Sequence, residues 1–514
     1  CDQLVVMSAT SKRPLVCNST SSEVEINVLD IVVEDKGLED SRIRSSSEVE
    51  LKVAKSQCTV SNSPEVLPDM RNILFGSQTL VHSSRLSLVR NYCSSHPSRD
   101  LRYWQLTSYG RRHDQTRVRG LDFTVMSYNV LAQALMEMHP QLYRDCDPAY
   151  LGWEYRSNLI LKEIQRTLPD VLCLQEAQSD HYQDFFTPQL AKLGYNGYYK
   201  QRPAGKVDGC CIFYRKSVFS LEDAVSIEYR HPGVPLLNRD NVGVIVKLRA
   251  KKSSSGPLCV ANTHLLFNPR RHDIKLAQTQ LLLSELDKLA YRGDSRSGDP
   301  IYCPSILTGD FNADVHSCAY QLLSEGHVRY EGRDTKSLRH QFRGGPINLM
   351  GRELLPPALG ITDHCQHHSH VKLRGSPSGT SIQTCGEGSQ VSGRPSDQNN
   401  SPSKPPEPST DNPRYPFRTG ALAHRFRLRS VYRPSPHYED GPVTTFQDEW
   451  IKVDHMFYST VLGDRSDKHI GGKLNLVGRY RLPTGRECLS LGHLPSKYFP
   501  SDHFFLLARF FLKK

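Results

Sequence analysis

Polar residues stand at the ends of a series of short apolar segments, and no other feature of the sequence constrains the fold as strongly. Residues 123–128 are followed by Asn129, and residues 171–174 are followed shortly by Glu176. Apolar segments of this length, rich in aromatic and β-branched residues, are typical of β-strands. The other polar residues at such ends are His264, Asp310, Asn312, Asp454, Asp502 and His503. Because a strand end is a rigid position, strands lying side by side would bring these side chains to one edge of a sheet.

Helical segments alternate with the predicted strands. Residues 156–168 place Ile160, Ile164 and Leu168 on one helical face and stop at Pro169. Residues 273–290 repeat the same three- and four-residue spacing of apolar side chains. Further strands are predicted at residues 242–248, 258–263, 301–307, 426–432, 450–458 and 504–511. Strands and helices mixed in this way predict a layered α/β or α+β domain.

Composition divides the chain of 514 residues into a catalytic domain and two segments outside its core. Residues 1–120 are first Ser-rich and acidic, then Arg-rich from residue 71, and we predict a flexible N-terminal region there. Residues 121–514 form the predicted catalytic domain. Within it, residues 364–415 are dominated by Ser, Pro, Gly, Asn and His, and they predict a disordered insertion. The histidine-rich cluster at 364–370 is interpreted as part of this solvated loop.

Cysteine usage and charge restrict the surroundings of the protein. The 14 cysteines include no CxxC pair, and several lie in apolar segments, which favours a reducing compartment. We expect the cytoplasm, with the nucleus and the mitochondrion left open by the Arg-rich leader. No segment reaches the ~18 apolar residues needed to cross a bilayer, so we expect no membrane partner. The net charge of +11 is compatible with a polyanionic partner such as RNA.

The residue types at the strand ends suit the hydrolysis of a phosphate ester. Hard oxygen ligands such as Glu176 favour Mg²⁺, with Mn²⁺ as the alternative cofactor. The metal would stabilise negative charge on the phosphoryl oxygens and on the departing oxygen. A water nucleophile also needs a base, and Asp310 or the neighbouring Asp502 and His503 are the candidates.

Two further side chains could stabilise the transition state. His264 and Asn312 are hydrogen-bond donors that could contact the developing charge. No cluster of cysteines accompanies the histidines, which argues against a closed structural zinc site. Taken singly, each of these residues is also typical of an ordinary turn or cap, so only the combination indicates catalysis.

Six short motifs, in order along the chain, resemble those of the endonuclease/exonuclease/phosphatase superfamily. They are Ser127-Tyr-Asn-Val130, Leu174-Gln-Glu176, Asn262-Thr-His264, Gly309-Asp-Phe-Asn312, Val453-Asp454 and Ser501-Asp-His503. Residues 131–143, 208–213, 237–243 and 262–278 look most like the Angel proteins, in the deadenylase branch that also contains nocturnin. The resemblance covers about residues 121–512. It implies a four-layer αββα sandwich with the active site at one edge of the paired sheets.

The resemblance also implies a role for each residue. Glu176 would be the principal metal ligand, and Asn129 would support the metal or the phosphate. Asp310 and Asn312 would orient the nucleophile or the leaving group. His264 and His503 would contact the scissile phosphate. Asp454 and Asp502 would set the protonation state and the orientation of these histidines.

Three functions follow from the resemblance. The Angel proteins imply Mg²⁺-dependent removal of 2′,3′-cyclic phosphates from RNA 3′ ends, which is the leading prediction. The wider branch implies a 3′→5′ poly(A) exonuclease, a deadenylase, acting on polyadenylated ends. A noncatalytic protein that binds RNA or a translation factor is the third alternative.

One departure from the deadenylase pattern bears on this choice. Deadenylases of the branch resemble one another in holding adenine between a proline and a phenylalanine, and a stacked base typically contributes ~1–3 kcal/mol. Pro269 matches the proline, but Glu449 stands where the phenylalanine is expected. A carboxylate cannot replace a ring, so adenine recognition is weakened unless Phe446 or Trp450 takes its place.

Basic residues near the predicted site could steer the RNA backbone toward it. Arg270 and Arg271 follow His264, and Arg202 and Lys206 lie shortly before Asp208. Ordinary solvated basic residues are the equally weighted alternative.

Overall fold

The structure is a computed structural model. It describes residues 101–113, 118–253, 255–338, 348–374, 416–433, 441–447, 449–460 and 473–514. All of these residues belong to one compact unit, Ser83–Lys514.

Seven strands form the first sheet, in the order β1-β18-β19-β2-β3-β5-β4. The strands β2 and β3 are parallel, and the other neighbours are antiparallel. The bounds are β1 Trp104–Leu106, β18 Leu474–Tyr480, β19 Leu506–Lys513, β2 Gly120–Asn129, β3 Val171–Gln178, β5 Asp208–Arg215 and β4 Tyr195–Gln201.

Six strands form the second sheet, in the order β14-β17-β11-β8-β7-β6. Here β8 and β11 are parallel, and the other neighbours are antiparallel. The bounds are β14 Leu428–Ser430, β17 Asp454–Ser459, β11 Ser305–Asp310, β8 Leu258–His264, β7 Asn238–Ala250 and β6 Phe219–Arg230. Three two-stranded sheets accompany them: β9 Tyr291–Asp294 with β10 Pro300–Tyr302, β12 His327–Arg329 with β13 Ala421–Ala423, and β15 Thr445–Gln447 with β16 Glu449–Ile451.

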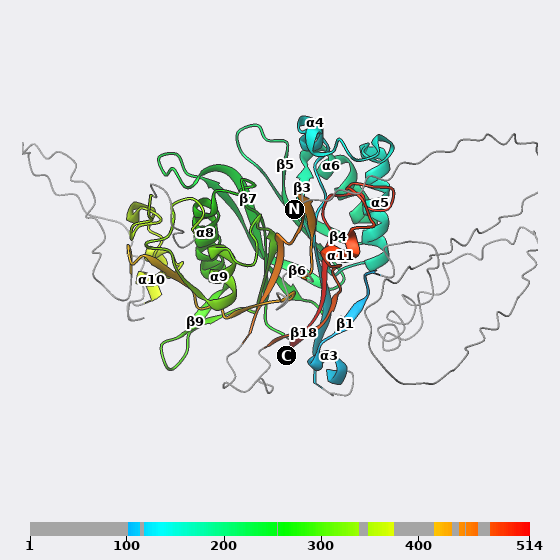
Figure 1. The fold of residues 1–514 in the computed structure, drawn as a ribbon. Coiled ribbons are helices and arrows are strands. Elements are labelled where there is room, and N and C mark those ends of the chain that lie inside the picture. The colour runs from blue at the N-terminus through cyan, green and yellow to red at the C-terminus, as the bar shows by residue number, and fades with distance from the viewer. Residues whose placement is uncertain are drawn as a thin grey trace, which may run out of the picture. The chain divides into compact units, whose positions relative to one another are not determined.

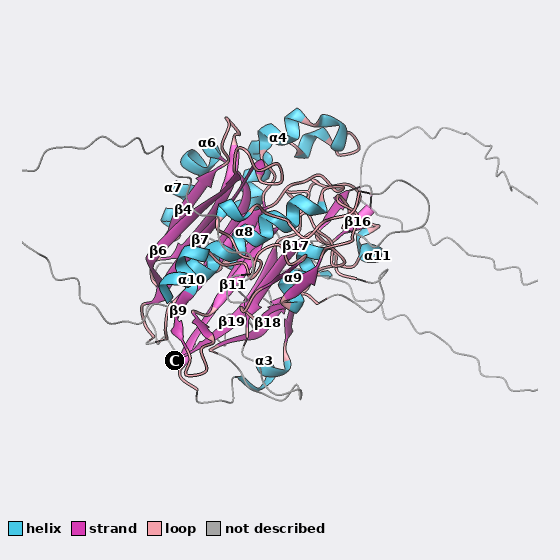
Figure 2. Cartoon of the chain, turned by 90° about the vertical axis from the view of Figure 1, so that its left-hand side faces the viewer, coloured by secondary structure: helices cyan, strands magenta, loops and turns pink. Residues whose placement is uncertain are grey.

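Helices cover the outer faces of the two sheets. In Figure 1, α5 lies on one side of the strands and α8 and α9 lie on the other, and Figure 2 looks onto the face covered by α8 and α9. The helices are α3 Ser108–His113, α4 Gln133–Met138, α5 Trp153–Thr167, α6 Ser179–His181, α7 Thr187–Lys192, α8 His272–Ala290, α9 Cys318–Glu325, α10 His368–Arg374 and α11 Gly485–Cys488. None of the helices in the described ranges has both the length and the apolar character to cross a membrane.

Three buried apolar clusters separate these layers. One packs between the two sheets and includes Val125, Val171, Val260, Ile306 and Met456. A second lies between the seven-stranded sheet and α5, and a third between the six-stranded sheet and helices α8 and α9. The alternation of side chains along each strand supplies both faces, since successive residues point to opposite sides. The predicted four-layer αββα sandwich is confirmed.

The sandwich begins before residue 121, which is the N-terminal boundary predicted from the sequence. Residues 101–113 form β1 and α3, and Trp104 pairs with Tyr480 across β1 and β18. Arg102 is buried, donates to the carbonyl oxygens of Arg481 and Phe505, and lies 4.0 Å from the centre of the Phe505 ring. The high arginine content predicted a flexible segment, but this arginine is held by carbonyl groups and aromatic rings. The rest of the predicted flexible region, residues 1–100, lies outside the described residues.

The predicted insertion also begins later than residue 364. Cys365 is buried, and the helix α10 ends in Arg374, whose guanidinium lies 2.7 Å from the Asp287 carboxylate and 3.6 Å from the centre of the Tyr291 ring. The histidine-rich cluster is therefore packed against α8, where His367 lies 2.8 Å from Glu285. Residues 375–415 lie outside the described residues. Composition could not show this packing, because the partners are far apart in the sequence.

We expect Arg374→Ala to lower the free energy of unfolding by about 3 kcal/mol, since it leaves the buried Asp287 carboxylate without its cation. Urea denaturation of the full chain measures this, with Leu373→Ala as the control because that neighbouring side chain is 72% exposed. A loss equal to that of the control would show that α10 contributes nothing to the core. For the same reason, a deletion of residues 370–412 is expected to destabilise the domain.

Candidate active site

The predicted site residues continue the rows of side chains that point between the two sheets. On β11, Ile306 lies in the inter-sheet cluster, and every second residue leads from it to Asp310. On β17 the same step leads from Met456 back to Asp454, and on β8 it leads from Val260 to His264. The apolar layer between the sheets thus ends, at one edge, in carboxylates and imidazoles.

Strand pairing aligns three of these residues side by side. Asp310 pairs with His264 across the parallel strands β11 and β8, and with Asp454 across the antiparallel strands β11 and β17. The Nε2 atom of His264 lies 3.6 Å from Oδ2 of Asp310. Backbone register therefore places an acidic residue at the centre of the site.

Glu176 reaches the site through a break in the alternation. Gln175 points between the sheets, so a regular strand would send Glu176 to the outer face. Instead, the pairing of β3 with β5 shifts between Leu174 and Ala177, and Glu176 has a φ of 54°. A bulge of this kind re-aims a side chain, and positive φ in a residue other than glycine often marks a functional position. The Oε2 atom of Glu176 accepts a hydrogen bond of 3.1 Å from the backbone N–H of Ala132.

Asn129 connects the two sheets at the site. Its Nδ2 atom donates to Oε1 of Glu176 at 3.0 Å and to Oδ2 of Asp310 at 3.1 Å. Its Oδ1 atom accepts from the backbone N–H of Leu131 at 3.1 Å, which fixes the orientation of the amide. Because Glu176 belongs to the seven-stranded sheet and Asp310 to the six-stranded sheet, this buried amide is one of the contacts that hold the two halves of the site together.

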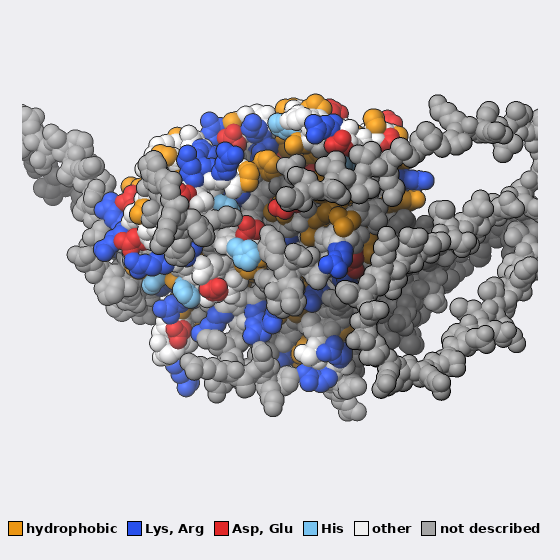
Figure 3. Space-filling model, viewed as in Figure 1, with side chains coloured by type: hydrophobic (Ala, Val, Ile, Leu, Met, Phe, Trp, Pro, Cys, Tyr) orange, Lys and Arg blue, Asp and Glu red, His pale blue; other side chains and the backbone are white. Residues whose placement is uncertain are grey.

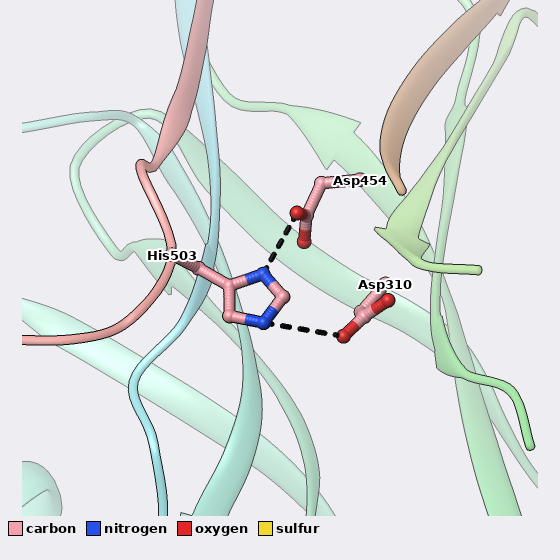
Figure 4. Close-up of side chains that lie close together, drawn as sticks. All are labelled: Asp310, Asp454 and His503. Carbon is pink, nitrogen blue, oxygen red and sulfur yellow. Dashed lines mark hydrogen bonds and ion pairs between the residues drawn. The ribbon is translucent and has the colours of Figure 1, made fainter. Parts of the chain in front are cut away.

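His503 lies between two carboxylates, as Figure 4 shows. Its Nδ1 atom is 2.8 Å from Oδ2 of Asp454, and its Nε2 atom is 3.8 Å from Oδ2 of Asp310. Burial disfavours the charged ring, but the carboxylates of Asp454, Asp502 and Asp310 outweigh it, so the pKa of His503 lies well above its usual value. The surrounding carboxylates therefore favour the protonated ring.

Asp502 acts on His503 by charge rather than by a hydrogen bond. Its Oδ1 atom is 4.0 Å from Nε2 of His503, and its Oδ2 atom accepts a hydrogen bond of 3.0 Å from the hydroxyl of Tyr143. Burial, followed by the charge of Asp502, raises the pKa of Tyr143. The tyrosine therefore stays a donor, and it ties the segment after α4 to the site.

The side chain and the backbone of Asn312 form hydrogen bonds with neighbouring protein groups. Its side-chain amide donates to the carbonyl oxygen of Leu265 at 3.1 Å, and its backbone N–H donates to Oδ1 of Asp310 at 2.8 Å. Its own carbonyl oxygen accepts from Nζ of Lys275, a buried lysine whose pKa burial lowers to about 8. In this geometry Asn312 positions Asp310.

The predicted RNA-contacting residues lie in the loop after β8. Pro269 and Arg270 are exposed, whereas Arg271 is held by Asp273 through hydrogen bonds of 2.9 and 2.8 Å. The loop is anchored by the N–H of Leu266, which donates to Oε1 of Gln278 at 3.0 Å. Arg270 is thus more available to a ligand than Arg271.

The aromatic residues beside Glu449 are engaged in packing. Trp450 stacks on Phe504 with ring centres 5.7 Å apart, and Phe446 lies 5.2 Å from Trp450 and 5.1 Å from His493. Glu449 itself is exposed. Neither ring is placed as an unpartnered platform for a base.

Sequence reasoning missed the polar residues that support the site from beneath. Gln175 and Asn262 are fully buried between the sheets, where Nε2 of Gln175 donates to Oδ1 of Asn262 at 2.6 Å. The Asn262 amide donates in turn to the carbonyl oxygens of Leu174 and Cys211, at 2.8 and 3.0 Å. The available signal was a polar side chain at an inward position of an apolar strand.

Arg156 was missed for a different reason. In the sequence it is the first residue of the predicted helix 156–168, where an arginine is expected to face solvent. It is fully buried and donates to the carbonyl oxygens of Val130, Leu131 and Pro500 at 3.1, 2.9 and 2.9 Å. It thereby joins the loop after Asn129 to the loop that leads into residues 501–503. Nothing in the local sequence indicates that contact.

We expect Asn262→Leu to lower the free energy of unfolding by about 2 kcal/mol, because it removes the donor to the carbonyl oxygens of Leu174 and Cys211 and leaves the Gln175 amide with Oγ of Ser127 as its acceptor. Chemical denaturation of the single variants and of the double variant Gln175→Leu with Asn262→Leu tests this. The double variant should lose less stability than the sum of the singles, since one leucine removes the orphan that the other creates. Strict additivity would show that the pair is not coupled.

The donor set fits a hard divalent cation. Glu176, half-buried, and Asp310 offer carboxylate oxygens, whereas Asn129, predicted to support the metal, donates its Nδ2 hydrogens to both carboxylates and so positions them. Such oxygen ligands suit Mg²⁺ or Mn²⁺. Asp310, Asp454 and His503 also present ligand atoms within 4.8 Å of one another, but the Asp454 carboxylate and the His503 ring are already bonded to each other at 2.8 Å. We therefore assign the cation to the Glu176 side of Asp310.

Comparison with known proteins defines the class of this fold and site. A model of the Endonuclease/Exonuclease/phosphatase family matches residues 126–503. The chain belongs to the endonuclease/exonuclease/phosphatase family.

Two relatives narrow the assignment of the chain within this family. Protein angel homolog 1 of Rattus norvegicus is 36% identical over 430 residues, a match that covers 76% of this chain and 63% of the relative. Protein angel homolog 2 of Mus musculus is 35% identical over 405 residues, covering 76% and 70%. Within the family, the chain is an Angel homolog, and it spans just under two thirds of the length of the rat relative.

A solved structure of the same branch is similar over most of this chain. The crystal structure of ANGEL2, a 2′,3′-cyclic phosphatase, in complex with adenosine-2′,3′-vanadate has a TM-score of 0.61 and 34% sequence identity. The alignment covers 80% of this chain and 99% of that chain.

Proposed function

We propose that the protein is a phosphoesterase that acts on RNA 3′ ends and removes terminal 2′,3′-cyclic phosphates. The observation that carries the proposal is the bridged cluster in which Asn129 joins Glu176 to Asp310 while His503 faces Asp310 from the other side. The similarity to a solved 2′,3′-cyclic phosphatase supports the choice of ester.

A bound divalent cation would be held by the carboxylate of Glu176, which Asn129 orients, and it would neutralise charge on the phosphoryl oxygens. Asp310, kept in place by Asn129 and Asn312, would accept the proton of the attacking water. His503, an imidazolium paired with Asp454, would donate to a phosphoryl oxygen or to the leaving ribose oxygen. His264, beside Asp310, would contact the phosphate.

Complete removal of a cyclic phosphate takes two hydrolytic steps. One water opens the ring and leaves a phosphomonoester on one ribose oxygen. A second water releases inorganic phosphate and leaves both hydroxyls free. Both steps require the same base and the same charge stabilisation, so one site serves them.

The competing function is shortening of poly(A) tails. Pro269 is retained and exposed, but Glu449 is exposed and the nearby rings of Phe446 and Trp450 pack against other aromatic residues. The adenine clamp of the deadenylase pattern is thus incomplete, and this favours the cyclic phosphate.

A side-by-side assay tests the proposal. The purified full chain with Mg²⁺, and separately with Mn²⁺, is given a 5′-labelled RNA ending in a 2′,3′-cyclic phosphate and a 5′-labelled polyadenylated RNA. We expect the first to lose its terminal phosphate without shortening and the second to stay intact. A ladder of shortened poly(A) with untouched cyclic ends would establish the deadenylase instead, and binding without any turnover would establish the noncatalytic protein.

A further inference from the structure

A pocket lies in the loop that joins β6 to β7. It is lined by Gly233, Val234, Pro235, Asn238 and Arg239 and has a volume of about 350 Å³. Its wall combines an apolar surface with one guanidinium and one amide. A nucleotide presents the matching groups, namely a flat base, hydroxyls and a phosphate.

The pocket belongs to the same edge of the sandwich as the candidate active site. Val242 on β7 pairs with His264 on β8, so the start of β7 extends beyond the level of His264. Val242 lies four positions after Asn238, which corresponds to about 13 Å at ~3.3 Å per residue. The loop is therefore too far from Asp310 to hold the reacting phosphate, but it projects from the same edge of the sandwich.

The loop is anchored rather than loose. Leu237 and Val234 are buried in the core cluster under α8. Within the loop, the N–H of His231 donates to the carbonyl oxygen of Leu237, and the N–H of Leu237 donates to that of Val234, both at 2.9 Å. A ligand that enters the pocket would meet a wall already in place, which reduces the ordering cost of binding.

Most arginines on this edge already have a carboxylate partner. Arg202 pairs with Asp208, Arg271 with Asp273, and Arg230 with Asp240 at 3.6 Å. In the described part of the chain, by contrast, the guanidinium of Arg239 donates only to the carbonyl oxygen of its neighbour Asn238, and Arg270 has no ion pair. Figure 3 shows Lys and Arg side chains gathered along the upper edge of the molecule, over the loops beyond β5 and β7.

We propose that this pocket is a subsite for a nucleotide upstream of the RNA 3′ end, with Arg239 on its phosphate and the exposed Pro235 against its base. The inference rests on the proposed function, and it assigns part of the RNA specificity to the segment 237–243, which resembles the Angel proteins. Single-stranded RNA is the ligand class, because a base must be free to enter the pocket.

The first measurement is binding of a 5′-fluorescein hexaribonucleotide of mixed sequence ending in a 3′ hydroxyl, followed by fluorescence anisotropy with the full chain. We expect Arg239→Ala to weaken binding about tenfold, and to reduce the slope of log Kd against log salt by about 0.7, the value for one phosphate contact on a single strand. The matched control is Arg249→Ala, which removes an exposed arginine at the opposite end of β7. Equal affinities and slopes for the two variants would overturn the subsite.

The second measurement compares kcat/KM for two substrates, a nucleoside 2′,3′-cyclic phosphate and a hexanucleotide that ends in the same cyclic phosphate. The gain is the factor by which kcat/KM is higher for the hexanucleotide. Arg249→Ala should keep the wild-type gain, and Arg239→Ala should lose most of it. An equal gain in both variants would refute the subsite and leave the proposed function standing. Arg239-dependent binding in a protein that hydrolyses neither compound would refute the proposed function and retain the subsite.

Discussion

Replacing Glu176 with glutamine is expected to lower kcat on cyclic-ended RNA by ~10³-fold or more, because the carboxylate is the proposed anchor of the cation and that charge stabilisation is worth several kcal/mol. Glutamine keeps the size of the side chain and can still accept from the N–H of Ala132. The melting temperature should therefore stay close to that of the wild-type protein. Single-turnover kinetics and a thermal scan measure the two effects separately.

The control for this variant is Glu154→Gln, which makes the same chemical change at an exposed position on α5. A titration with Mg²⁺ after treatment with EDTA adds a second readout. The wild-type protein should regain activity with a saturable dependence on Mg²⁺, and Glu176→Gln should require a higher concentration. Undiminished turnover in Glu176→Gln would remove this residue from the metal site.

Asp454→Asn is expected to lower kcat by ~10²–10⁴-fold, the range for loss of a positioned acid or base. Asp454 accepts from Nδ1 of His503, and its charge helps to keep the ring protonated. Without that carboxylate the pKa of His503 falls toward its usual value. The imidazolium is present below this pKa and is lost as the pH rises through it, so the variant should lose its residual activity at a lower pH than the wild-type protein.

Two measurements check this expectation. The pH profile of kcat should show its alkaline limb displaced to lower pH in Asp454→Asn, and an NMR titration of the His503 ring should show the lowered pKa directly. Asp145→Asn, a change at a side chain that is 58% exposed, is the matched control. An unchanged His503 pKa in Asp454→Asn would mean that Asp502 and Asp310 alone set the charge of the ring.

The positions of the site residues could be predicted because a two-residue period governs both packing and chemistry. The same alternation that buries Val260 and Ile306 between the sheets carries His264 and Asp310 to the edge. The convergence of these ends was therefore predictable from sequence. The bulge that turns Glu176 inward was not, because it depends on how β3 pairs with β5.

The contacts that hold the site together are long-range, and local sequence does not encode them. Arg156 reaches Pro500 across 344 positions, and Asn129 reaches Asp310 across 181. The same limitation explains the two errors in the predicted boundaries. Arg102 and Arg374 looked like residues of solvated segments, yet their partners are supplied by parts of the chain that composition cannot bring together.

The bridge made by Asn129 has a consequence for how the protein would fail on warming. Hydrogen bonds of 3.0 and 3.1 Å join carboxylates that belong to separate sheets, so a small separation of the two halves breaks the bridge while each sheet keeps its own ladder. Turnover should then disappear at a temperature where circular dichroism still reports intact strands. Loss of turnover would therefore report the separation of the two sheets before any loss of secondary structure.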